Sequence, residues 1–245
     1  MNTNSEFFLR NELLLGPAAV AKLGEALVAI IGLGAVGSFA LEALARAGVG
    51  RFRLADFDEI RPSNLNRHLA ALHSTIGRKK AEAAAARVAD INPDCRVEAL
   101  ELFADVTSFP RILEGPPDVV IDAIDSVGPK SALLSAAVRA GVPAVISCMG
   151  AANRGEPLAA KVAPLSKTRD CPLAREVRGR VPKDLQKHLL CVYSDEPPWH
   201  PPAPPEADGA LRRGRPRRTL GSLCCVTGVF GLIAAREAIR AITGR

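Results

Sequence analysis

The sequence predicts an α/β protein with a doubly wound, Rossmann-like and mostly parallel sheet. Short apolar runs alternate with segments of helical apolar spacing between residues 26 and 150, as in successive βαβ units. The first run ends in a glycine-rich turn, "GLGAVG", at the point where such folds bind ligands. Hydrophobic residues make up 48% of the chain and aromatic residues 4%, which indicates a large aliphatic core.

The chain of 245 residues is long enough for one large domain, and we expect a single one over 1–245. Its core covers about 26–150. A crossover and basic loop occupies about 151–218, and a helix follows at 220–242.

The core elements follow from local pattern. Residues 5–26 predict one or two amphipathic helices. Apolar or alternating runs predict strands, in chain order, at 26–32, 51–58, 96–102, 118–125 and 143–150. Helical spacing and stop signals predict helices at 35–48, 74–90 and 129–140.

The C-terminal extension breaks this alternation. Residues 197–218 are rich in Pro and charge, so we expect a mobile loop there. In the helix that follows, the uncharged stretch Thr219–Ala235 has 17 residues with three Gly, at the lower limit for spanning a bilayer. A buried apolar helix packed on the sheet is the preferred interpretation, and membrane association is not expected.

Charge and cysteine usage narrow the class of protein. Residues 1–150 carry a net charge of −2 and residues 151–245 a net charge of +8. The second half can therefore meet a polyanion, unless a solvated loop accounts for the excess.

The six cysteines form no CxxC pair, which argues against structural zinc, and Cys224 and Cys225 are expected in the core. With no secretory leader visible, we expect a cytoplasmic protein with reduced thiols.

The glycine-rich turn predicts a nucleotide site. Gly32 permits the tight turn, Gly34 lets the backbone approach a phosphate, and Gly37 lets the helix pack on the strand. Asp56 lies 19 residues after Gly37, at the end of the next strand, where a carboxylate binds a ribose. The alternative is a tight turn without a ligand.

The segment after Asp56 favours a triphosphate over a dinucleotide. Asn64 can hydrogen-bond a phosphate or ribose oxygen, Arg67 can bind phosphate oxygens as a fork, and Lys80 supplies a point charge. Such groups neutralise the charge that develops as pyrophosphate leaves. No G-x-x-x-x-G-K-[ST] motif is present, which excludes a P-loop enzyme.

"DAIDS" (122–126) places two more carboxylates at the end of a later strand. A carboxylate beside a triphosphate is suited to Mg²⁺, and Asp125 is the favoured ligand. Asp122 has two interpretations that remain open, a part in this site or a loop-anchoring or helix-capping carboxylate.

The order "GLGAVGS…DFDEIRPSNLNRH…IGRKKAEAAAARVADINPDCRV…VVIDAIDS" resembles the ubiquitin-activating-enzyme-like adenylyltransferases, whose bacterial members include the ThiF and MoeB types. That family adenylates a carboxylate with ATP and Mg²⁺, releasing pyrophosphate. The resemblance implies an ATP site and a homodimer in which an arginine reaches the triphosphate of the other subunit. His68 departs from the family, where Gln is common. The implied site residues are Asp56 and Asp58 of the double acid, Asn64, Arg67 and Lys80 at the phosphates, Asp125 at Mg²⁺, and Arg10 from the partner.

Residues 118–134 and the later "LSKTRDCPLAREVRGRV" and "CVYSDEPP" resemble the tRNA threonylcarbamoyladenosine dehydratases within that family. That subgroup adenylates the carboxylate of the modified adenosine, and an internal atom then displaces AMP and closes a ring. It implies tRNA as the partner, with sulfur-transfer proteins such as cysteine desulfurases as further family partners. Arginines that would contact tRNA phosphates are Arg212, Arg213, Arg215, Arg217 and Arg218.

Other interpretations remain open at this point. Activation of a sulfur carrier's C-terminal glycine is one, although such enzymes usually carry two CxxC pairs. An NAD-binding oxidoreductase and a catalytically silent dimeric scaffold are others. Cys171 and Cys191 lie where related enzymes have a crossover loop, so a nucleophilic role for either is open, although an intramolecular nucleophile needs none.

Overall fold

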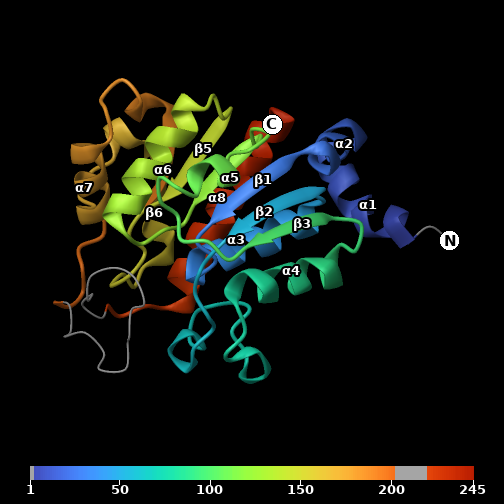
Figure 1. The fold of residues 1–245 in the computed structure, drawn as a ribbon, viewed down its shortest axis with the longest axis horizontal. Coiled ribbons are helices and arrows are strands. Elements are labelled where there is room, and N and C mark those ends of the chain that lie inside the picture. Colours follow the sequence, from blue (N-terminus) through green and yellow to red (C-terminus); the bar gives the residue numbers. More distant parts are fainter. Residues whose placement is uncertain (1–2, 202–219) are drawn as a thin grey trace.

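In the computed structural model, which describes residues 3–201 and 220–245, seven strands form one sheet in the order β3-β2-β1-β4-β5-β7-β6. All neighbours are parallel except β6 and β7. The mostly parallel, doubly wound sheet is therefore confirmed (Figure 1). The strands are β1 (Leu27–Ile31), β2 (Arg51–Ala55), β3 (Arg96–Leu100), β4 (Val119–Asp122), β5 (Ala144–Cys148), β6 (Ala160–Pro164) and β7 (Leu189–Ser194).

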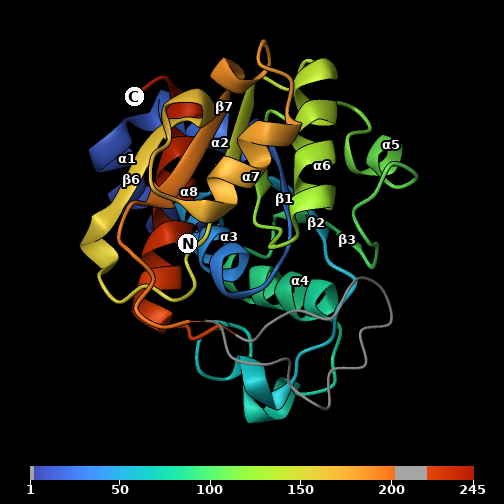
Figure 2. The same cartoon turned by 90° about the vertical axis from the view of Figure 1, so that its left-hand side faces the viewer.

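Helices cover both faces of the sheet, as Figure 2 shows from the side. The α-helices are α1 (Thr3–Leu15), α2 (Pro17–Glu25), α3 (Ala35–Ala47), α4 (Lys80–Ile91), α5 (Phe109–Ile112), α6 (Val127–Arg139), α7 (Pro172–Arg180) and α8 (Cys224–Thr243). Short 3₁₀ turns are η1 (Pro62–Asn64), η2 (His73–Thr75), η3 (Pro157–Ala159), η4 (Leu165–Lys167) and η5 (Gln186–His188).

Strand β1 explains why the runs in the sequence are continuously apolar. Side chains alternate between faces, and Val28 and Ile30 join the core under α3, α4 and α8. Ala29 and Ile31 join the second core, under α5, α6 and α7. A parallel strand buried on both faces needs no polar alternation.

The helix expected at 74–90 begins later, at Lys80. Gly77 adopts φ +86°, and its N–H donates to the carbonyl of Ile60 at 2.9 Å. The N–H of Ile60 donates in turn to the carbonyl of Arg78 at 2.9 Å. These tertiary bonds hold residues 74–79 as a turn despite their helical spacing.

The segment 151–218 contains regular elements that the sequence analysis did not predict. Strand β7 pairs with β5 and extends the sheet, and β6 pairs antiparallel with β7 at the edge. Helix α7 lies between β6 and β7 in the chain. Strand β6 alternates only weakly in burial, so its pattern is not distinctive. The expected mobile loop falls largely on 202–219, outside the described residues.

The C-terminal helix packs as expected. Buried residues of α8, including Phe230 and Ala234, belong to the core beside α3. The expectation that Cys224 and Cys225 lie in the core was wrong, since both are exposed in the first turn of α8. Their apolar surroundings in sequence concealed which side of the helix they occupy. Within the described residues, no helix is long and apolar enough to cross a membrane.

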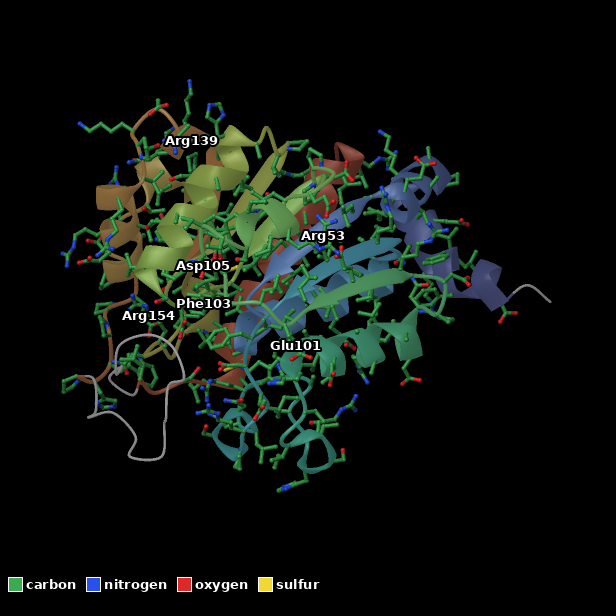
Figure 3. The ribbon with its side chains drawn as sticks, viewed as in Figure 1. Arg53, Glu101, Phe103, Asp105, Arg139 and Arg154 are labelled. Atoms are coloured by element: carbon green, nitrogen blue, oxygen red, sulfur yellow. The ribbon has the colours of Figure 1, made fainter. Side chains whose placement is uncertain are left out.

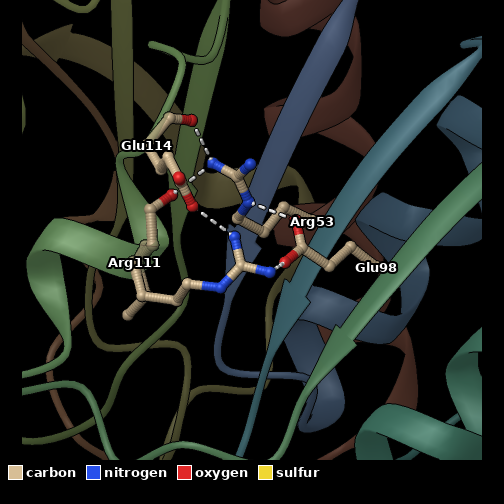
Figure 4. A network of polar contacts seen from close by, with 5 residues as sticks. Arg53, Glu98, Arg111 and Glu114 are labelled. Carbon is tan, nitrogen blue, oxygen red and sulfur yellow. Dashed lines mark hydrogen bonds and ion pairs between the residues drawn. The ribbon is translucent and has the colours of Figure 1, made fainter.

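A polar network fixes α5 to the face of β2 and β3 (Figure 4). Arg53, buried in β2, donates to Glu98 of β3 at 2.7 Å and to the carbonyl oxygens of Ile112 (3.0 Å) and Glu114 (2.6 Å). Arg111 pairs with Glu98 and Glu114. These bonds satisfy the carbonyls where α5 ends, so this network has a structural role.

Candidate functional site

The candidate site lies at the point where the order of the strands in the sheet reverses. The chain runs from β1 outward to β3 and then returns to β4 on the other side of β1. Doubly wound folds bind ligands at the carboxyl ends of strands at such a switch point. The loops after β1, β2 and β4 all begin there, which brings the predicted glycine loop and acidic segments to one edge.

Two of the three glycines in the glycine loop, Gly32 and Gly37, are packed too closely for a side chain. Gly32 has φ +90°, and a Cβ there would lie 2.7 Å from the carbonyl oxygen of Ala123. A Cβ on Gly37 would lie 1.9 Å from the carbonyl oxygen of Gly32, so α3 can seat on the turn only with glycine here. A Cβ on Gly34, the N-cap of α3, would meet open space. The α3 amino terminus therefore faces a space where an anion can approach its N–H groups.

Asp56 ties the glycine loop to β2. Its Oδ2 accepts a hydrogen bond from the Leu33 N–H at 2.7 Å, and its Oδ1 accepts one from the Asp58 N–H at 2.9 Å. Burial raises the pKa of Asp56, while the charge of Lys80 opposes that rise. The Asp56 carboxylate, which is predicted to bind a ribose, is thus oriented by the loop that is predicted to bind the phosphates.

The segment between Asp58 and Lys80 closes on itself. Lys80, only 9% exposed, begins α4 and places its Nζ 3.0 Å from Oδ2 of Asp58. Asn64 Oδ1 accepts from the Arg61 N–H at 3.1 Å. Arg67 donates from Nη1 to the carbonyl of Ser63 at 2.8 Å. Lys80 is thus tied to the acidic end of β2, while the hydrogen bonds of Asn64 and Arg67 are local to residues 61–67.

The two acids of "DAIDS" have different environments. Asp122 is fully buried, and its Oδ2 accepts from Lys130 Nζ at 2.5 Å and from the Ser147 hydroxyl at 2.6 Å. Its Oδ1 accepts from the Ile124 N–H at 3.0 Å, which favours the loop-anchoring interpretation. Asp125 lies in the same loop, just before α6, and is exposed.

The sequence did not point to Lys130, and it marked His68 as a departure from the family without giving it a role. Lys130 is 0% exposed and lies in α6, and a lysine so close after two strand-end acids was the available signal. His68 is 6% exposed and bonds through Nε2 to the carbonyl oxygen of Leu33 at 2.6 Å. Burial lowers its pKa to about 4, so the ring is neutral and Nε2 donates.

Arg10 does not join the site within one chain. It is exposed on α1, whose Asn11 bonds to the carbonyl of Arg46 near the end of α3. The glycine loop lies at the other end of α3. The assignment of Arg10 to the triphosphate of a partner subunit therefore stays a prediction.

A nucleophilic role is not supported for Cys191. It is fully buried in β7, and burial raises its pKa far above the usual range, so the reactive thiolate is disfavoured. Cys171 is also buried, at 3% exposure.

The described residues contain no group of three His, Cys, Asp or Glu side chains that could hold a metal by themselves. Mg²⁺ beside a triphosphate is bound by one or two carboxylates, phosphate oxygens and water. An exposed carboxylate at Asp125 fits that pattern of partial protein ligation.

The doubly wound sheet with a glycine turn at its switch point is the architecture of a nucleotide-binding α/β protein. The ThiF family matches residues 8–245, and the chain belongs to that family.

Several relatives share one description. A tRNA threonylcarbamoyladenosine dehydratase of Bacillus subtilis is 42% identical, covering 78% of this chain and 75% of that protein. Its Escherichia coli counterpart is 34% identical, covering 93% and 90% respectively. The crystal structure of the E. coli enzyme in complex with ATP aligns with a TM-score of 0.87 at 30% identity, covering 100% and 96% of the two chains. An AMP complex aligns with a TM-score of 0.88 at 31% identity.

Proposed function

We propose that this protein is an ATP-dependent tRNA threonylcarbamoyladenosine dehydratase. The observation that carries the proposal is the glycine loop, Asp56, Lys80 and Asp125 gathered at one switch point. Its support is the similarity, over most of both chains, to dehydratases from two bacteria and to structures of one of them with ATP and AMP.

The reaction begins with a carboxylate oxygen of the threonylcarbamoyl group. That oxygen bonds to the α-phosphorus of ATP while the bond from this phosphorus to the β-phosphate bridging oxygen breaks, and pyrophosphate leaves. An internal nucleophile of the same modification then attacks the activated carbonyl carbon. AMP leaves with the bonding electrons and a proton is lost, so the tRNA loses one water and gains a ring.

The residues divide this work. Asp56 binds the ribose and, through Leu33, keeps the glycine loop at the phosphates. Asn64, Arg67 and Lys80 bind phosphate oxygens and neutralise the departing pyrophosphate. Asp58, paired with Lys80, orients that ammonium group. Since the nucleophile is part of the acceptor, proximity replaces a covalent cysteine intermediate.

Asp125 would hold Mg²⁺. The cation would offset the negative charge of the triphosphate as the carboxylate approaches. The network of Asp122, Lys130 and Ser147 orients the loop that ends at Asp125.

The alternative functions have less support. Activation of a carrier glycine fits the shared adenylation chemistry, and a SAMP-activating enzyme E1 is 34% identical, but over only 54% of this chain. An NAD-dependent oxidoreductase does not require the phosphate ligands after Asp56. A catalytically silent scaffold does not require the complete set of Asp56, Asn64, Arg67, Lys80 and Asp125.

The assembly and partners belong to the same proposal. We expect a homodimer in which Arg10 of each subunit reaches the other's triphosphate. The substrate is tRNA carrying threonylcarbamoyladenosine, and the place of action is the cytoplasm. Sulfur-transfer proteins are a further expected class of partner by family resemblance.

Replacing Asp125 tests the site. We expect Asp125→Asn to reduce AMP release by about a hundredfold or more, because it removes the carboxylate at Mg²⁺. The measurement is AMP formed from ATP and Mg²⁺ with modified tRNA, with unmodified tRNA and with a carrier protein. Asp90→Asn, at an exposed position of α4, is the control and should behave as wild type. AMP release by Asp125→Asn at the wild-type rate would refute the assignment, and AMP release with the carrier alone would favour the alternative function.

A further inference from the structure

A buried guanidinium at the carboxyl edge of the sheet has no role in the site described so far. Arg154 lies in the loop that follows β5, and the residue is 4% exposed. Its Nε and Nη1 atoms are buried and have no hydrogen-bond partner among the described residues. Burying the donors of a cation without partners is strongly unfavourable. Such an arrangement persists where an anion completes it.

The backbone around Arg154 is held rigidly. Asn153 adopts φ +61°, its N–H donates to the carbonyl of Gly221 at 2.7 Å, and its carbonyl accepts from the Trp199 N–H at 3.1 Å. A Cβ on Gly155 would lie 1.8 Å from the Trp199 ring, so the indole packs directly on this backbone. The residues on both sides of Arg154 are therefore fixed, and the guanidinium is preorganised.

The charge of Arg154 lowers the pKa of two nearby carboxylates, Asp195 and Glu196, as a minor cause in each, but both carboxylates form hydrogen bonds with other groups. Asp195 pairs with Lys161, whose hydrogen bond is the main reason that the pKa of Asp195 is lowered, and Arg154 contributes only a weaker charge effect. Glu196 accepts two backbone N–H bonds and one from the Trp199 indole. Neither carboxylate accepts a hydrogen bond from Nε or Nη1 of Arg154.

The loop that carries Arg154 begins at the same edge of the sheet as the candidate nucleotide site, but it follows a different strand. The sheet order places β5 beside β4, while the glycine loop and Asp56 follow β1 and β2. The N–H of Asn153 donates to the carbonyl of Gly221, and the carbonyl of the next residue, Ser222, accepts from Asn66, so the Arg154 loop lies close to the segment that carries Asn64 and Arg67. Figure 3 shows it at the end of the sheet where Phe103 and Asp105, which follow β3, also lie.

We propose that Arg154 binds the carboxylate of the acceptor substrate before that group is adenylated. This rests on the proposed function, which requires a carboxylate to approach a triphosphate. Two groups of like charge repel, and a guanidinium that pairs with the carboxylate removes much of that cost. Enclosure of the pair excludes water and strengthens the interaction. Arg154 is therefore the residue that distinguishes modified from unmodified adenosine.

The test compares tRNA with and without the threonylcarbamoyl group. Wild-type protein should bind modified tRNA about ten- to a hundredfold more tightly, as for a charge-assisted hydrogen bond. Arg154→Met should bind both tRNAs with the affinity that wild type shows for the unmodified one, with ATP affinity unchanged. Arg139→Met, at an exposed position of α6, is the matched control and should retain the wild-type preference.

Stability separates this role from a structural one. Removing an incompletely paired buried charge should leave the melting temperature of Arg154→Met equal to or above that of wild type. If Arg154→Met does not fold, the same measurements are made on Arg154→Lys. That variant should show a reduced preference for modified over unmodified tRNA, with normal ATP affinity. The proposal is overturned if the folded variants keep the full preference, lose affinity for both tRNAs equally, or lose ATP affinity. Absence of AMP release by wild type, with the preference intact, would refute the proposed function and leave the carboxylate site standing.

Discussion

Leu33 shows how single residues set the geometry of the nucleotide loop. Its N–H donates to Asp56 and its carbonyl accepts from His68, so both polar groups of one residue in the glycine turn are fixed. The glycine spacing and the distance to Asp56 were predictable from the sequence. The role of His68 was not, because its contact with Leu33 spans 35 residues and depends on how the intervening chain folds.

His68 also predicts how stability depends on pH. Its pKa is about 4 in the folded protein, against an ordinary value of 6.5 for an exposed histidine, so the unfolded state binds a proton more readily between these values. Stability should therefore fall, by about 3 kcal/mol, as pH falls from 6.5 through 4. The free energy of unfolding, measured with urea at pH 7 and at pH 4, tests this expected loss.

His68→Gln is the control for that pH effect. Its amide donates to the same carbonyl without titrating, so the variant should lose about 3 kcal/mol less than wild type over this range. An equal loss in both proteins would show that other groups account for the acid sensitivity.

At the scale of elements, close contact between α3 and α8 depends on glycine. A Cβ on Gly231 would lie 2.4 Å from the carbonyl oxygen of Val36 and 2.8 Å from Cβ of Phe39. Apolar spacing predicted both helices and the burial of α8. It could not predict their contact, nor the strands β6 and β7, because edge pairing and helix crossing depend on partners distant in sequence.

Gly231→Ala should destabilise the protein by about 1–3 kcal/mol, because the clash is with backbone and the helices must separate. Gly179→Ala is the matched helical control, since a Cβ there meets nothing within 4 Å. It should leave stability unchanged or raise it by up to about 1 kcal/mol through helix propensity. Chemical denaturation of both variants checks this. Equal effects of the two substitutions would contradict the packing argument.

At the scale of the whole molecule, charge separates the two halves of the chain. The net charge is +6, and residues 151–245 carry the excess of cations. Composition alone could indicate a polyanionic partner but could not place the residues that meet it. Five arginines between 212 and 218 lie outside the described residues, so their role stays a prediction from sequence.

Neutralising these five arginines to Gln should weaken tRNA binding and flatten its dependence on salt, because fewer counterions are released. Binding measured over a series of salt concentrations gives the slope. For each phosphate that the protein no longer neutralises, the slope should decrease by about 0.9 in a duplex region and about 0.7 in a single strand. An unchanged slope would remove this segment from the tRNA interface.

We propose that this protein removes water from threonylcarbamoyladenosine in tRNA at the expense of ATP. The most direct measurement is mass spectrometry of nucleosides from modified tRNA incubated with the purified protein, ATP and Mg²⁺. We predict that the modified adenosine loses the mass of one water molecule, with one AMP formed for each conversion, and that nothing changes without ATP. An unaltered nucleoside mass, under conditions where the protein binds ATP and the tRNA, would show that the protein does not catalyse this dehydration.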